Sequence, residues 1–121
     1  MAEQKLASKP LGAPEETRKF PHGKIELVKL GDVTAGRGTF EPGWKWSVDV
    51  KPIAGTTSCQ AAHTGYVLSG RMRVRMDDGT EVEVGPGDAY VFPPGHDGWT
   101  VGNEPAVLLD FSGFSNYAKP A

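Results

Sequence analysis

Two β-rich runs separated by a tight-turn signal constrain the fold of this chain more than any other feature. The first run covers residues 65–76 and the second covers residues 81–84, with Asp78 and Gly79 between them. An Asp-Gly pair favours the positive φ angles of a tight hairpin turn. The sequence therefore predicts a β-hairpin at the centre of the chain, followed by a third strand at residues 89–92.

Turn residues divide the rest of the chain into similarly short runs. Glycine and proline are frequent, with 16 and 10 among 121 residues, and no segment combines capping residues with a helical apolar period. The pattern predicts about eight or nine short strands, which is typical of an all-β sandwich or barrel. One of them is residues 44–50, where alternation places Trp44, Trp46, Val48 and Val50 on one face.

The chain is long enough for one domain. Residues 1–23 are predicted to be an N-terminal arm, partly extended or disordered, because they are polar and interrupted by Pro10 and Pro14. Residues 24–114 are assigned to the β-barrel and residues 115–121 to a C-terminal tail.

The charge pattern argues against several classes of partner. The net charge is −2, and the alternating Arg71, Arg73 and Arg75 are expected to face Glu81 and Glu83 across the hairpin. The sequence therefore has no cluster of Lys and Arg of the kind that binds nucleic acid, and no apolar run is long enough to span a bilayer. The chain has neither the hydrophobic block of a signal peptide nor a second cysteine for a disulfide, so a cytoplasmic location is expected.

Three short motifs resemble the two-motif core of the cupin superfamily: VLSG at residues 67–70, GPGD at 85–88 and VFPPG at 91–95. The likeness covers roughly residues 40–111 and implies a small RmlC-like jelly-roll β-barrel that forms a homodimer. Many cupins hold Fe, Mn, Ni, Zn or Cu through three histidines and a glutamate. Such cupins act as dioxygenases, isomerases, lyases or decarboxylases, whereas others bind ligands without catalysis.

At the positions of the four usual cupin ligands, this sequence has other residue types. Counting back from the glycine that ends the first motif, the family's glutamate falls on His63, and its two histidines fall near Thr57 and Cys59. The histidine of the second motif falls on Gly98, while this chain has His96 two residues earlier. The resemblance therefore does not carry the usual ligand set over to this sequence.

Cysteine and histidine are nevertheless concentrated here, which predicts a metal site formed by Cys59, His63 and His96. A strand at residues 58–69 would put Cys59 and His63 on one face about 13 Å apart, so a bend or bulge must bring them together. Thiolate and imidazole suit Zn, Cu or Fe(II); Mn and Ni are the other candidates from the resemblance. Asp97 is a candidate oxygen ligand or a partner that orients a histidine.

Aromatic residues form a second group of candidates. Those predicted to line a substrate pocket at the barrel mouth are Trp44, Trp46, Tyr66 and Trp99. A barrel of this size holds one small ligand, and aromatic walls favour a planar molecule. Arg37 or Lys45 is the candidate partner for a carboxylate on that molecule.

Two functions remain open at this stage. The first is a cupin that binds a metal ion and a small organic molecule, as a metal-dependent enzyme of oxygenase, isomerase or lyase type. The second is a metal-free binding or sensor protein, in which Cys59 packs as a small hydrophobe, His63 bonds to Tyr66 and His96 lies in a solvated loop. A third hypothesis is a dimer with a purely structural role. His63 argues against it, because a structural barrel would place an aliphatic residue at a position that faces the cavity.

Overall fold

The computed structural model describes residues 5–114 and 117–119. Over these residues the chain forms nine strands and two one-turn helices. The elements in chain order are β1 (Glu16–Phe20), β2 (Gly23–Leu30), β3 (Val33–Phe40), α1 (Trp46–Asp49), α2 (Lys51–Ala54), β4 (His63–Ser69), β5 (Arg71–Met76), β6 (Glu81–Val84), β7 (Ala89–Phe92), β8 (His96–Val101) and β9 (Ala106–Asp110).

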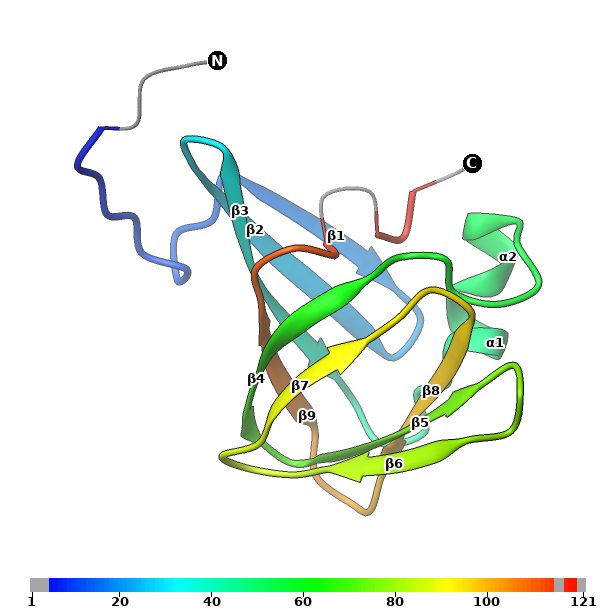
Figure 1. Ribbon diagram of the computed structural model, residues 1–121. Coiled ribbons are helices and arrows are strands. Elements are labelled where there is room, and N and C mark those ends of the chain that lie inside the picture. The colour runs from blue at the N-terminus through cyan, green and yellow to red at the C-terminus, as the bar shows by residue number, and fades with distance from the viewer. Residues whose placement is uncertain (1–4, 115–116, 120–121) are drawn as a thin grey trace.

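The strands form two antiparallel sheets that pack on either side of one core (Figure 1). The larger sheet has the order β1-β2-β3-β9-β4-β7, and the smaller has the order β6-β5-β8. Strands that are distant in sequence pair with one another, as β3 does with β9 and β5 with β8. This double-sheet arrangement with long connections is a jelly roll, so the predicted all-β class is confirmed.

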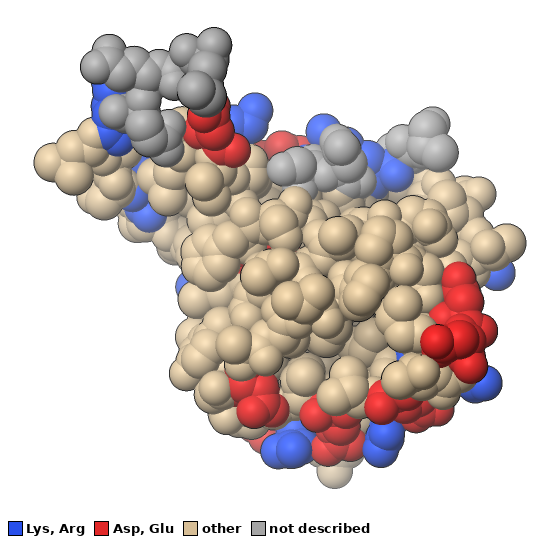
Figure 2. All heavy atoms as spheres, viewed as in Figure 1, with Lys and Arg blue, Asp and Glu red and all other residues tan. Residues whose placement is uncertain are grey.

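The predicted central hairpin is present as β5 and β6. Its turn contains Gly79 at φ 93°, and Arg73 is paired in register with Glu83. The Arg71 Nε donates to Glu83 Oε2 at 2.8 Å, and Arg73 Nη1 donates to Glu81 Oε1 at 3.3 Å. Arg71 and Arg73 therefore form the expected ion pairs on the outer face. Figure 2 shows charged side chains gathered along this edge, whereas the face over β4 and β7 carries few charges.

The chain passes from one sheet to the other between β4 and β5 at Gly70. This residue has φ 72°, and a Cβ added to it would overlap the carbonyl of Pro105. A side chain is therefore excluded here both by the backbone conformation and by the close approach of the β8–β9 loop. The crossing leads the chain from the strand that begins at His63 into the hairpin.

The predicted strand at residues 44–50 is wrong, because this segment contains helix α1. The helix begins where Asp97 Oδ1 accepts a hydrogen bond from the Ser47 N–H at 3.0 Å. Spacing by four residues buries Trp46 and Val50 together, whereas Val48 is turned outward and is 64% exposed. Alternation of apolar residues is compatible with both structures over so short a run, and contacts distant in sequence decide between them.

The N-terminal segment contributes an edge strand to the larger sheet. Strand β1 lies within the predicted arm of residues 1–23 and pairs antiparallel with β2. The predicted tail of residues 115–121 lies partly outside the described residues, since only 117–119 are described. In the described parts of the chain, no helix has the length and apolarity required to cross a membrane.

Candidate metal site

Cys59, His63 and His96 lie together inside the jelly roll. One ligand atom from each residue lies within 4.8 Å of the ligand atoms of the other two, and all three side chains are buried. The Sγ of Cys59 is 3.8 Å from the Nε2 of His63. The centroids of the two imidazole rings are 5.4 Å apart. The three residues proposed as metal ligands from the sequence are therefore brought to one place.

An irregular segment before β4 makes this meeting possible. The predicted strand at residues 58–69 begins only at His63, and Cys59 instead forms an isolated bridge with His96. The Cys59 N–H donates to the His96 carbonyl at 2.7 Å, and the Gly95 N–H donates to the Cys59 carbonyl at 2.7 Å. Because residues 60–62 are not in a strand, the long separation expected along an extended strand does not arise.

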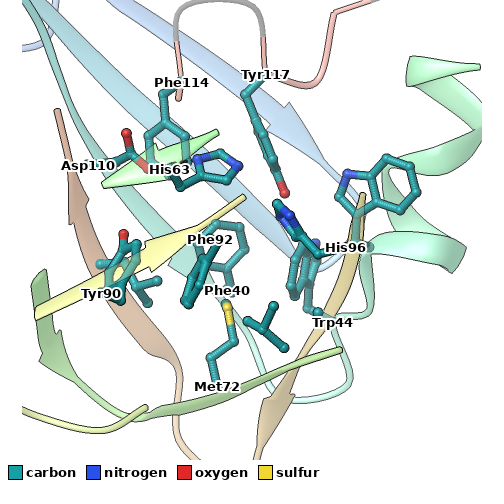
Figure 3. A pocket seen from close by; sticks show the side chains of 14 residues that line it. Phe40, Trp44, His63, Met72, Tyr90, Phe92, His96, Asp110, Phe114 and Tyr117 are labelled. Carbon is teal, nitrogen blue, oxygen red and sulfur yellow. Dashed lines mark hydrogen bonds and ion pairs between the residues drawn. The ribbon is translucent and has the colours of Figure 1, made fainter. Parts of the chain in front are cut away.

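His63 is held by a buried carboxylate on the neighbouring strand. Its Nδ1–H donates to Asp110 Oδ2 at 2.7 Å, and Asp110 Oδ1 accepts the backbone N–H groups of Ser112 at 2.9 Å and Gly113 at 2.6 Å. Gly113 lies so close that an added Cβ would overlap the His63 ring. The imidazole, which lies beside Asp110 and Phe114 in Figure 3, is thus fixed in orientation, with its Nε2 3.8 Å from the Sγ of Cys59.

His96 is fixed in the same tautomer by a different partner. Its Nδ1 is 2.6 Å from the carbonyl oxygen of Pro93, and because a carbonyl only accepts, Nδ1 carries the proton. Burial lowers the pKa of His96, and the nearby His63 lowers it further against the opposing effect of the Pro93 carbonyl. The ring of His96 is therefore neutral at neutral pH and presents an unprotonated Nε2.

Cys59 is a thiol in this environment. Burial raises the pKa of Cys59 to about 11, and the negative charge of Asp110 acts in the same direction. A cysteine with a raised pKa lacks the thiolate character of a free catalytic nucleophile. A metal ion that binds Cys59 must therefore displace the thiol proton.

Two cavities meet at this cluster. The inner cavity has a volume of about 30 Å³, and its lining includes His63, His96 and Trp44. The outer pocket has a volume of about 650 Å³ and is lined in part by Cys59. Trp46 and Tyr117 line both and form the wall between them. The three candidate ligands thus lie between a small internal space and a larger opening to solvent.

Two of the four aromatic residues predicted to line a substrate pocket lie at the inner cavity. Trp44 and Trp46 do line the inner cavity, but Tyr66 and Trp99 do not. Tyr66 is three residues after His63 on β4, so the two point to opposite faces of the sheet, and Tyr66 is 42% exposed. Trp99 follows His96 by three residues on β8 and faces outward for the same reason. The Lys45 Nζ lies 5.3 Å from the centroid of its ring.

The other predicted polar partners also lie elsewhere. Asp97 Oδ1 accepts the backbone N–H groups of Ser47 and Gly98 and does not contact the histidines. Arg37 pairs with Glu26 at 3.2 Å on the outer face of the larger sheet. Lys45, stacked over Trp99, is also remote from the inner cavity.

Sequence reasoning missed Asp110, Phe114 and Tyr117, which complete the surroundings of the cluster. Asp110 carried a readable signal, because it continues the inward alternation of Ala106 and Leu108 on β9 as the single charged member. Phe114 and Tyr117 follow the last strand, where no period indicates their direction. Both are buried, and their rings each lie 5.5 Å from that of His63.

The chain is thus a double-sheet jelly roll with a cluster of candidate metal ligands inside it. Comparison with known proteins identifies the family to which such a fold belongs. The model of the cupin domain family matches residues 54–112, which include the candidate ligands and the central hairpin. A comparison with curated proteins found no match.

Solved structures with the same fold match over most of the chain. An RmlC-like cupin from Shewanella frigidimarina superposes with a TM-score of 0.62 at 18% identity, covering 94% of this chain and 96% of that one. A protein of unknown function from Rhizobium leguminosarum gives a TM-score of 0.60 at 21% identity, covering 97% and 99%. A variant of oxalate decarboxylase from Bacillus subtilis gives 0.61 at 20% identity, covering 95% of this chain and 30% of that one.

The chain belongs to the cupin superfamily. Both the family predicted from the motifs and the jelly-roll fold are confirmed. At these identities the solved structures establish the fold alone, and this chain spans less than a third of the length of oxalate decarboxylase.

Proposed function

We propose that this cupin binds one divalent transition-metal ion through Cys59 Sγ, His63 Nε2 and His96 Nε2, and that the ion acts on a small organic molecule. One observation supports the proposal most strongly. The Nδ1–H of each histidine donates a hydrogen bond to a fixed acceptor, which leaves its Nε2 for the space between the three side chains. A carboxylate or carbonyl behind a histidine is the usual support for a metal-ligating imidazole.

The donor set narrows the choice of metal. Of Zn, Fe, Cu, Mn and Ni, the ions best suited to one thiolate and two imidazoles are Zn, Cu and Fe(II). Three protein ligands leave a coordination position for water or substrate. A metal ion bound there would supply Lewis acidity, by polarising a substrate oxygen or lowering the pKa of a bound water.

The chain's own residues provide the rest of the proposed site. Asp110 keeps the His63 ring from rotating, and the buried Cys59 gives up its proton when it becomes a ligand. The outer pocket, at about 650 Å³, is of the size that holds a small organic molecule. We infer that the organic part of the substrate lies there, on the Cys59 side of the site. An oxygenase, isomerase or lyase is the class of enzyme that this arrangement would serve.

A metal-free binding protein is the second candidate. The raised pKa of Cys59 favours it, because the thiol is protonated and uncharged without a metal. In that case the outer pocket alone would hold the small molecule, and the His–Asp pair would serve packing. The two candidates differ in whether a metal ion is retained.

Metal content after purification, and competitive titration with Zn²⁺ or Co²⁺, test the proposal. We expect one equivalent of metal in the native protein and at least a hundredfold weaker binding in Cys59→Ala and His96→Ala. His22→Ala is the matched control, since His22 lies in a turn and bonds to Asp49 instead. A folded native protein that binds no metal, or equal binding by all four proteins, would overturn the proposal and favour the metal-free candidate.

A further inference from the structure

The side chain of Tyr117 is largely buried, and its hydroxyl group lies beside the candidate metal site. Tyr117 is 6% exposed and lines the inner cavity. Figure 3 shows its hydroxyl directed toward His96. No described residue shares a hydrogen bond with this hydroxyl. The segment that carries it is anchored, because Arg18 Nη1 donates to the backbone carbonyls of Phe114 at 3.0 Å and Tyr117 at 2.6 Å.

An unpaired donor lines the same cavity. The indole nitrogen of Trp44 is, among the described residues, the one buried side-chain nitrogen or oxygen without a partner. Trp44 itself is 3% exposed. Leaving a buried donor such as Trp44 Nε1–H unpaired is unfavourable, which indicates a ligand that pairs with it. The Tyr117 hydroxyl lines the same cavity and is available to the same ligand.

Tyr90 provides a comparison, because its hydroxyl group in the same cavity has a hydrogen-bond partner. Its ring also lines the inner cavity, but its hydroxyl donates to the backbone carbonyl of Leu109 at 3.1 Å. Both rings therefore line the inner cavity, and the two residues differ in whether the hydroxyl group has a hydrogen-bond partner among the described residues. Burial raises the pKa of Tyr117 well above its usual range, so its hydroxyl keeps its proton and can donate.

We propose that Tyr117 Oη–H and Trp44 Nε1–H bind the carboxylate oxygens of a small organic acid beside the metal ion. This inference rests on the proposed function. Two donors and a divalent cation around one space favour a negatively charged oxygen ligand. The acceptor groups nearby are already engaged, since Asp110 binds His63 and two backbone N–H groups.

The sizes of the two cavities divide the ligand into two parts. At about 30 Å³ the inner cavity has room for a group of a few atoms, such as a carboxylate, but not for a whole substrate. The remainder of the acid then lies in the outer pocket, past the wall formed by Trp46 and Tyr117. The site would thus select organic acids by their head group and tolerate variation in the body.

Acetate binding to the Co²⁺-loaded protein tests this inference, because the visible absorption of Co²⁺ reports a change in its ligands. We expect acetate to change the spectrum of the native protein. In Tyr117→Phe the acetate dissociation constant should rise about tenfold, as expected for loss of a hydrogen bond to a charged group. The Co²⁺ dissociation constant should stay within about twofold of the native value.

Tyr90→Phe is the matched control, since it removes a hydroxyl from the same cavity that is already bonded to the backbone. Trp44→Phe should weaken acetate binding as well, and Trp99→Phe should not, because Trp99 faces outward. Thermal unfolding of each variant shows whether it is folded.

The failures of the two proposals look different. This inference is overturned, and the proposed metal site is unaffected, if Co²⁺ binds normally but acetate does not change the native spectrum. The same conclusion follows if Co²⁺ binds normally and Tyr117→Phe and Tyr90→Phe have equal affinity for acetate. A native protein that binds no Co²⁺ overturns the proposed function, and this inference with it.

Discussion

Asp110 accepts a hydrogen bond from His63 across two neighbouring strands, with 2.7 Å between Oδ2 and Nδ1 and with both side chains buried. Strands β9 and β4 pair antiparallel, and their inward positions face the same cavity. The other carboxylate oxygen is held by two backbone N–H groups of the loop that follows β9. The orientation of one candidate ligand thus depends on the end of the last strand.

Asp110→Asn should weaken metal binding by about ten- to a hundredfold, as for other residues that support a metal ligand. An amide presents an NH₂ group either to the His63 Nδ1–H or to the N–H groups of Ser112 and Gly113. Two donors then face each other, and the ring loses its fixed orientation. Competitive titration with a chromophoric chelator measures the effect.

Asp97→Asn is the control for that experiment, because Asp97 is next to His96 in sequence but bonds to Ser47 and Gly98. We expect its metal affinity to remain within about threefold of the native value. Equal loss of affinity in both variants would show that general destabilisation, and not orientation of His63, explains the effect.

Gly113→Ala should destabilise the protein by about 1–3 kcal/mol, since inserting a methyl group into a filled site forces its neighbours to move. The new Cβ would overlap the His63 ring and the Ala62 carbonyl, which belongs to backbone that cannot easily shift. Chemical denaturation measures the change in the free energy of unfolding. Gly12→Ala is the comparison, because nothing lies within 4 Å of its added Cβ. A native-like Gly113→Ala would show that this loop is looser than the structure indicates.

The fold was largely predictable because its strongest signals are local. The Asp78-Gly79 turn and the alternating runs on either side of it depend on neighbours in sequence, and β5 and β6 form as expected. Helix α1 could not be predicted in this way. Its first turn depends on Asp97, which is 50 residues from Ser47 in sequence.

The residues that cluster at the candidate site were predictable from the sequence, but their surroundings were not. Cys59, His63 and His96 stand out by residue type, whatever the path of the chain between them. Tyr66 was placed in the pocket although it lies three residues from His63 on the same strand, and strict alternation puts the two on opposite faces. Tyr117 lies outside any strand, so only the folded chain shows where its hydroxyl points.

Stability should fall at alkaline pH because of Cys59. Burial raises its pKa from 9.0 to about 11, so between these values the unfolded chain loses the thiol proton while the folded protein retains it. The thiol's contribution to stability is complete below pH 9 and is lost as the pH rises toward 11, by about 2–3 kcal/mol in total. Denaturation of metal-free protein at several pH values measures the fall. Cys59→Ser should show a smaller fall, and an identical one would mean that other groups cause it.

Metal affinity should rise with pH by about tenfold per unit between pH 7 and 9, because binding to Cys59 releases one thiol proton. The raised pKa of Cys59 keeps the thiol protonated across this range. The lowered pKa of His96 means that this ring is already neutral and adds no second proton. Competition titrations at pH 7, 8 and 9 give the slope, and Cys59→Ala, which has no thiol proton to release, should bind more weakly with a nearly flat profile. A flat profile in the native protein would show that Cys59 is not a ligand.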